Sequence, residues 1–161
     1  MTAKRDLLDY FSLRHTQLSH LEATLKQVIE PNMVVHTKVE LNLTAREMQE
    51  KPSTGAPTYQ ISAQMTCQGY PEGAAEGAEP LFRVLMLVHA AYRQFAGEPL
   101  SFADFAQDHS SLSRQLYPVL HHQLRPILQQ LGLSKVNLPY DLVDAEIDFT
   151  STTPPPTTAL H

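Results

Sequence analysis

The sequence predicts an α+β domain, in which a four-stranded, mostly antiparallel sheet is followed by helices. Two segments, Val34–Thr44 and Thr58–Tyr70, alternate between apolar and polar residues. This alternation is typical of strands with one face on the core and the other in water. After Gly97 the spacing becomes helical, with a leucine stripe from Leu112 to Leu131. Strands followed by helices indicate the α+β class.

A third strand is expected over Leu81–Phe95, which is apolar on both faces for most of its length. Such a strand must be covered twice, by its own core and by a second layer. In a small protein the second layer is often another subunit, so this segment predicts an oligomer. The connections Ala45–Pro57 and Pro71–Pro80 are rich in Gly and Pro, as exposed hairpin loops are.

The N-terminal region is compatible with either of two structures. Leu18, Leu21 and Leu25 have helical spacing, whereas Leu21, Ala23 and Leu25 alternate as in a strand. Periodicity leaves both structures open.

Two helices are expected near the C-terminus. Ser101 is placed to cap a short helix, and Ser110 or Ser111 to cap a long one. Pro126 should kink the long helix or remove a hydrogen bond from it. Gly132 is well placed to end it.

The predicted domain covers residues 11–149. Residues 1–10 are expected to be a flexible N-terminal segment. Residues 150–161 are rich in Pro and Thr and are expected to be a disordered tail.

The composition limits the function classes. The net charge of −5 and the pI near 5.9 argue against a nucleic-acid-binding protein, which usually carries a basic face. The single cysteine excludes an intramolecular disulfide and fits a reducing cytoplasm. No signal peptide is apparent, and the longest apolar run is much shorter than the ~20 residues that span a bilayer. We therefore expect a cytoplasmic protein that does not insert into a membrane.

The sequence offers no convincing catalytic or metal site. His121 and His122 are adjacent and point to different sides of a helix, so they are poorly placed to share one ion. Cys67 lies on the apolar face of its strand, which indicates a buried, inert thiol. We expect no metal, no cofactor and no catalytic residue. The alternative is a small-ligand-binding or catalytic α+β domain, with a pocket near His109, Tyr117 and His122.

Aromatic and leucine side chains gather around the passage from the third strand into the helices. Each of them, taken singly, is more readily explained as core. As a set they also fit the lining of a groove.

One segment resembles a known family. LYPVLHHQLRPILQQLGLSKVNLPYDL, which begins at Leu116, is similar to the end of the SecB chaperone domain, and LFRVLMLVHAAYRQFAG resembles the last strand of that family and its exit. The resemblance covers roughly Phe11–Leu142 and is most specific over Leu116–Pro139.

The resemblance implies a Greek-key sheet, a first strand over the ambiguous N-terminal segment, and a homotetramer built as a dimer of dimers. It implies an ATP-independent holdase, without enzymatic activity, for unfolded preproteins that exporting members pass to SecA. The client-binding groove would be lined by Tyr92, Phe95, Phe102, Phe105, Tyr117, Leu133, Val136 and Leu138.

The sequence departs from the exporting members on the outer face of the sheet, where those members present acidic residues to SecA. Leu85 stands where a glutamate is expected, and Glu22 is the candidate SecA contact that remains. Delivery to SecA is therefore in doubt. The resemblance also implies an alternative, because divergent SecB-like proteins are dedicated chaperones of antitoxins in toxin–antitoxin systems.

Overall fold

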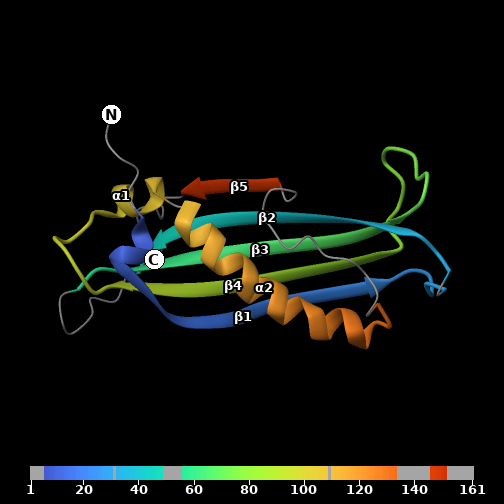
Figure 1. The fold of residues 1–161 in the computed structure, drawn as a ribbon, viewed down its shortest axis with the longest axis horizontal. Helices are drawn as coiled ribbons and strands as arrows, with labels where there is room; N and C mark the ends of the chain where they lie inside the picture. Colours follow the sequence, from blue (N-terminus) through green and yellow to red (C-terminus); the bar gives the residue numbers. More distant parts are fainter. Residues whose placement is uncertain (1–5, 31, 49–55, 109, 134–145, 152–161) are drawn as a thin grey trace, which may run out of the picture.

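A five-stranded sheet with one long helix across it forms the molecule (Figure 1). The computed structural model describes residues 6–30, 32–48, 56–108 and 110–133, and the backbone of 146–151. The elements, in chain order, are the 3-10 helix η1 (Leu7–Asp9), β1 (Phe11–Leu25), β2 (Val35–Glu47), β3 (Thr58–Pro71), β4 (Phe82–Gln94), α1 (Phe102–Gln107), α2 (Ser110–Gln130) and β5 (Glu146–Ser151).

The strand order is β1-β4-β3-β2-β5. Strands β2, β3 and β4 follow one another as antiparallel neighbours, and β1 pairs antiparallel with β4 on the far side. Three consecutive antiparallel strands, here β2, β3 and β4, with the remaining strand β1 placed beside the last of them, form a Greek key. The predicted four-stranded antiparallel sheet is therefore confirmed, and the ambiguous N-terminal segment is a strand.

Strand β5 was not predicted. It pairs in parallel with β2, over Glu40–Ala45 of that strand. It extends to Ser151, two residues into the segment expected to be a tail. Residues 152–161 lie outside the described part of the chain.

The core lies between the sheet and α2, which runs diagonally over one face (Figure 1). Each central strand turns its apolar residues to this face, so that Leu41, Met65 and Met86 are fully buried. The stripe on α2 meets them because residues spaced three and four apart share one side of a helix. Its buried leucines are Leu112, Leu116, Leu120, Leu124 and Leu128.

The chain before β1 is part of the core. Asp6 caps η1 by accepting a hydrogen bond from the Leu8 N–H, at 3.1 Å. Leu7 is fully buried, and its N–H donates to the Ser111 hydroxyl at 3.1 Å. The segment expected to be flexible thus contains a residue that is held by α2.

The predicted helix ends at Ser101 and Gly132 are confirmed, whereas the predicted cap of the long helix at Ser110 or Ser111 is wrong, because both residues already lie within α2. The Ser101 hydroxyl accepts a hydrogen bond from the Asp104 N–H at 3.2 Å and caps α1. Gly132 has a φ of 78°. The N–H groups of Gly132 and Leu133 donate to the carbonyls of Gln129 and Leu128, which is the Schellman pattern. Both Pro118 and Pro126 lie within α2.

Candidate functional site

The residues predicted to line a groove differ in how much of their surface is exposed. Four of them, Tyr92, Phe105, Tyr117 and Leu133, are buried with at most 2% of their surface exposed. A side chain without exposed surface cannot contact a client, so these four are corrected from groove to core in the single chain. Phe102 is half-buried and Phe95 is 62% exposed. Val136 and Leu138 lie outside the described residues.

The buried aromatic residues form one cluster under α1. The Phe105 ring lies 5.0 Å from Phe11, 4.9 Å from Tyr59 and 6.2 Å from Tyr92, between centroids. All three pairs are tilted, an arrangement that brings ring edges toward ring faces. The cluster joins β1, β3, β4 and α1, and it anchors the connection between sheet and helices. Its role is structural.

The Tyr92 hydroxyl is buried and makes no hydrogen bond to another described residue. It is the one atom of this cluster in that position. Burial raises the pKa of Tyr92 well above the usual value, because the charged phenolate would lose its hydration. Leaving such a hydroxyl unpaired costs about 1–3 kcal/mol.

Replacing Tyr92 by phenylalanine removes this hydroxyl and keeps the ring. We expect the free energy of unfolding to rise by about 1 kcal/mol, since the unpaired polar group is lost without a cavity. Urea denaturation of wild type and Tyr92→Phe would measure it. A loss of stability of this size would mean that the hydroxyl has a partner.

The loop after β4 is held rigidly by Gln94. The Gln94 amide donates to the carbonyls of Ala96 at 2.9 Å and Glu98 at 2.6 Å, and its oxygen accepts from the Leu100 N–H at 2.9 Å. The Tyr59 hydroxyl donates to the Leu100 carbonyl at 2.6 Å. A buried glutamine satisfied in this way fixes a loop that has no regular structure of its own.

Phe95 projects from this rigid loop into solvent. Its N–H donates to the Tyr10 carbonyl at 2.8 Å, while its ring borders an open depression of about 310 Å³ with Ala56, Pro57 and Pro99. Gly97 is required beside it, because its φ is 78° and a Cβ would lie 2.9 Å from the Tyr10 ring. An exposed aromatic ring on a fixed loop is suited to apolar recognition.

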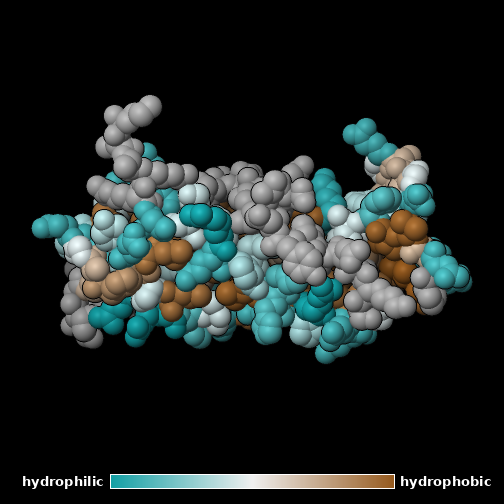
Figure 2. Space-filling model, in the orientation of Figure 1, coloured by the Kyte–Doolittle hydropathy of each residue, from teal (hydrophilic) through white to brown (hydrophobic). Residues whose placement is uncertain are grey.

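Further apolar surface lies on β1, at one edge of the sheet. Leu18 and Leu21 pair in register with Val88 and Met86, which face α2, yet each is 42% exposed. Val28, beyond the end of β1, is 76% exposed. Figure 2 shows apolar surface in several separate places on the α2 side, including the end of the sheet that carries the β1–β2 and β3–β4 connections.

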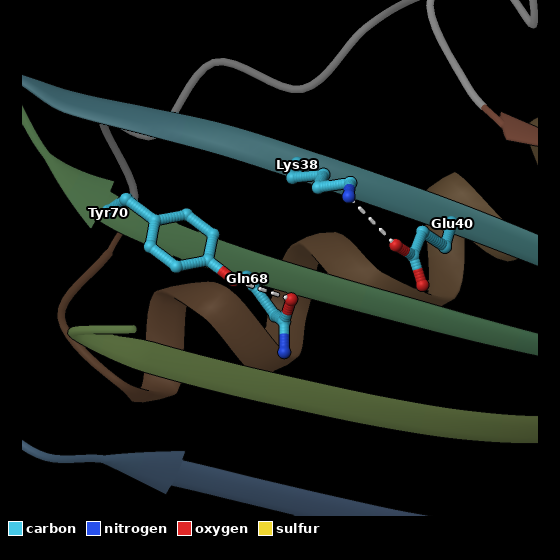
Figure 3. Close-up of polar contacts among 4 residues, drawn as sticks. All are labelled: Lys38, Glu40, Gln68 and Tyr70. Carbon is cyan, nitrogen blue, oxygen red and sulfur yellow. Dashed lines mark hydrogen bonds and ion pairs between the residues drawn. The ribbon is translucent and has the colours of Figure 1, made fainter. Parts of the chain in front are cut away.

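The opposite face of the sheet is polar except on β4. Leu85 and Leu87 lie there half-exposed, as expected for the strand that is apolar on both faces. On β2, Lys38 forms an ion pair with Glu40 at 3.1 Å, and on β3 the Tyr70 hydroxyl donates to Gln68 at 2.9 Å (Figure 3).

Glu22 lies on this outer face, directly opposite Leu85. Its carboxylate is exposed and lies 3.6 Å from the His20 ring. Alternation places four cations on the outer positions of β2 and β4 but only one acid, Glu40. The four cations are Lys38, Arg46, Arg83 and Arg93.

The alternative pocket near His109, Tyr117 and His122 has no catalytic arrangement among the described residues. Tyr117 and His122 border a shallow depression together with His121 and Arg125, and none of these is an acid. Burial, Arg125 and His122, in that order, lower the pKa of His121. His109 lies outside the described residues.

Cys67 is fully buried, and burial raises the pKa of its thiol to about 12. It is therefore inert at neutral pH, as predicted. In the described residues no three His, Cys, Asp or Glu side chains are grouped closely enough to hold a metal ion. None of the described helices is long and apolar enough to cross a membrane.

The Greek-key sheet with a long helix across one face is the fold of SecB-like chaperones. Among solved structures, the chain is similar to the SecB-like chaperone Rv1957 of Mycobacterium tuberculosis, in complex with a ChAD peptide from the HigA1 antitoxin. The TM-score is 0.64 and the sequence identity 12%, over 84% of this chain and 93% of that one. No family model and no curated protein matches the chain. The chain therefore has a SecB-like fold.

Proposed function

We propose that this chain is an ATP-independent holdase chaperone, which binds unfolded polypeptides and has no enzymatic activity of its own. The observation that carries the proposal is the SecB-like fold combined with exposed apolar side chains on fixed backbone, Phe95 above all. An unfolded client exposes apolar side chains in no fixed order. A binder for it needs apolar surface with little shape selectivity.

The client surface that we propose differs from the one expected from sequence. Phe95 and Phe102 remain candidates because they are accessible, and Val136 and Leu138 remain candidates from the family resemblance. Binding through several weak sites raises the overall affinity without any single deep pocket.

We infer that the client is an antitoxin rather than the range of preproteins served by an exporting chaperone. The structural neighbour is bound to a peptide from an antitoxin. In addition, the outer face carries Leu85 in place of an acid, and on β2 and β4 cations outnumber acids on that face. Glu22 is the one candidate SecA contact, and an isolated exposed carboxylate contributes little to binding. We place the protein in the cytoplasm, where both its antitoxin client and SecA would be met.

The holdase proposal is tested by light scattering of an unfolding protein. Reduced α-lactalbumin aggregates on loss of its disulfides, and stoichiometric amounts of this chain, without ATP, are expected to suppress the scattering. Bovine serum albumin at the same mass serves as the control for nonspecific protection. Unchanged aggregation would exclude the function.

The antitoxin proposal is tested separately, by genome context and by binding. A toxin–antitoxin pair encoded beside this gene, whose antitoxin peptide binds more tightly than reduced α-lactalbumin, would support it. Equal affinity for both would favour a general holdase. Binding of purified SecA that is lost in Glu22→Gln would instead support export.

We also propose a homotetramer, a dimer of dimers. Support comes from β1, an edge strand with Leu18 and Leu21 exposed, and from β4, with Leu85 and Leu87 half-exposed on its outer face. Edge strands pair readily with a second chain, and apolar surface on them favours that pairing.

Replacing Leu18 and Leu21 together by threonine is expected to shift the assembly to smaller species. Threonine keeps the strand propensity and removes the apolar surface. Size exclusion with light scattering reports the mass. The matched control replaces Gln17 and His20, on the other face of β1, by threonine and should leave the mass unchanged. A monomeric wild type would contradict the tetramer.

A further inference from the structure

Phe95 belongs to a small apolar surface that carries no charge. The Phe95 surface consists of Phe95, Ala56, Pro57, Ala96 and Pro99, which border the depression of about 310 Å³, and no charged residue lines that depression. The Phe95 ring is 62% exposed. Aromatic rings on a surface bind polyproline II segments, because the stiff apolar ridges of such a segment pack against flat rings. The Phe95 surface therefore fits an uncharged, proline-rich chain.

This chain contains a segment of that chemistry. Residues 154–160 have the sequence PPPTTAL, and no residue from Thr152 to Leu160 is charged. Consecutive prolines favour the polyproline II conformation before any contact is made. Such a segment loses little conformational entropy on binding. Residues 154–160 thus match the Phe95 surface in charge, in apolar character and in backbone conformation.

The sheet register directs the chain toward this surface. Strand β5 ends at Ser151, which pairs with Ala45 near the end of β2. Because β5 runs parallel to β2, the chain leaves it toward the end of the sheet where the Gln94 N–H donates to the Pro57 carbonyl. In Figure 1 the arrow of β5 points to the end of the sheet that carries α1. The Phe95 surface lies at this same end.

The distance from Ser151 is within reach of the segment. Pro57 lies two strands across from Ser151 and four residues further along, and Phe95 lies three strands across and five residues further along. With strands ~4.8 Å apart and a rise of ~3.3 Å per residue, these separations are ~16 Å and ~22 Å. A polyproline II chain advances ~3.1 Å per residue, so Pro156 reaches ~16 Å from Ser151 and Leu160 reaches ~28 Å.

We propose that residues 154–160 dock on the Phe95 surface of their own chain, and that client segments must displace them. The displacement rests on the proposed holdase function, whereas the docking stands without it. Because the segment and the surface belong to one chain, the effective concentration of the segment is on the order of 1 mM, and a weak apolar contact suffices. A client segment with aromatic side chains buries more apolar area than proline, threonine and alanine do, and therefore replaces it.

Disulfide capture in the full chain tests the docking. The test pair is Ala159→Cys with Ala96→Cys, which joins the segment to the Phe95 surface. The matched control is Ala159→Cys with Arg46→Cys, because Arg46 is exposed and directly follows Ala45, the partner of Ser151. Arg46 is therefore closer to Ser151 than Ala96 is. A segment without a docking site would react with it at least as fast.

Both pairs are oxidised in a glutathione buffer, and mass spectrometry of unreduced peptides measures the rate. Cys67 does not interfere, because it is fully buried with its pKa raised to about 12. We expect the Ala96 pair to close about tenfold faster than the Arg46 pair, and Phe95→Ala should remove this difference. Equal rates for the two pairs would overturn the proposal. So would a disulfide between two chains, which would place the segment on a second copy.

Light scattering of reduced α-lactalbumin tests the displacement. Replacing Pro154, Pro155 and Pro156 together by serine weakens the docking, so about threefold less chaperone should halve the aggregation. The control replaces Thr157 and Thr158 by serine, keeps the prolines and should behave as wild type. An unchanged requirement for chaperone in the proline variant would overturn the displacement. If no variant suppresses aggregation while the Ala96 pair still closes faster, the holdase function fails and the docking stands.

Discussion

Replacing Phe105 by alanine is expected to lower the free energy of unfolding by about 3–5 kcal/mol, the cost of removing a fully buried aromatic ring. Phe105 is the ring on which Phe11, Tyr59 and Tyr92 converge. Its loss leaves a cavity at the junction of three strands and α1. Urea denaturation followed by circular dichroism measures the effect.

Phe95→Ala is the matched control, because it removes the same kind of ring from the loop between β4 and α1. Phe95 is 62% exposed, so its loss should change stability by less than about 0.5 kcal/mol. The proposed holdase activity should respond in the opposite way: it should weaken in Phe95→Ala. Equal destabilisation by the two variants would contradict the division into core and exposed aromatics.

Strands β2 and β3 were predictable because each alternates between apolar and polar residues, and β4 because it is a long run that is mostly apolar on both faces. On β1 the alternation is broken. The register with β4 shifts between Leu13 and His15 and again between Leu18 and His20. Each shift adds a residue, so Leu18 and Leu21 are three apart and still share a face. A bulge therefore separates two apolar residues on the same face of the strand by three positions. The same separation is found between apolar residues on one side of a helix.

The missed strand β5 has a different cause. Its segment is short, and its partner β2 lies about a hundred residues earlier in the chain. A parallel neighbour requires a crossover connection, which here consists of β3, β4, α1 and α2. No local signal in six residues identifies such a partner. The composition of residues 150–161 also favoured a tail, and β5 reaches Ser151.

The candidate site was less predictable than the fold. Tyr92 and Phe95 are near neighbours in sequence and both aromatic, yet one is fully buried and the other is largely exposed. The difference arises at Gln94, whose side chain ties the loop to Ala96, Glu98 and Leu100. Polar contacts of this kind set the direction of the chain after the strand. Hydropathy contains no information about them.

Replacing Gly69 by alanine is the second large change, with an expected loss of about 3 kcal/mol in the free energy of unfolding. A Cβ on Gly69 would lie 2.1 Å from the Phe82 ring, which packs over the glycine from the neighbouring strand. Phe82 is fully buried at the end of the core. Its ring therefore has no free space to enter, and the sheet itself must distort.

Gly73→Ala separates this steric effect from backbone strain. Gly73 has a φ of 75° and nothing within 4 Å of its Cβ position. Alanine there should cost about 1 kcal/mol, from the left-handed backbone alone. Since Gly69 has no positive φ, the larger loss of stability in Gly69→Ala must come from contact with Phe82. Thermal and urea denaturation measure the stability of both variants. Similar losses of stability would mean that the Phe82 ring can move aside. Phe82 would then not be a rigid contact for Gly69.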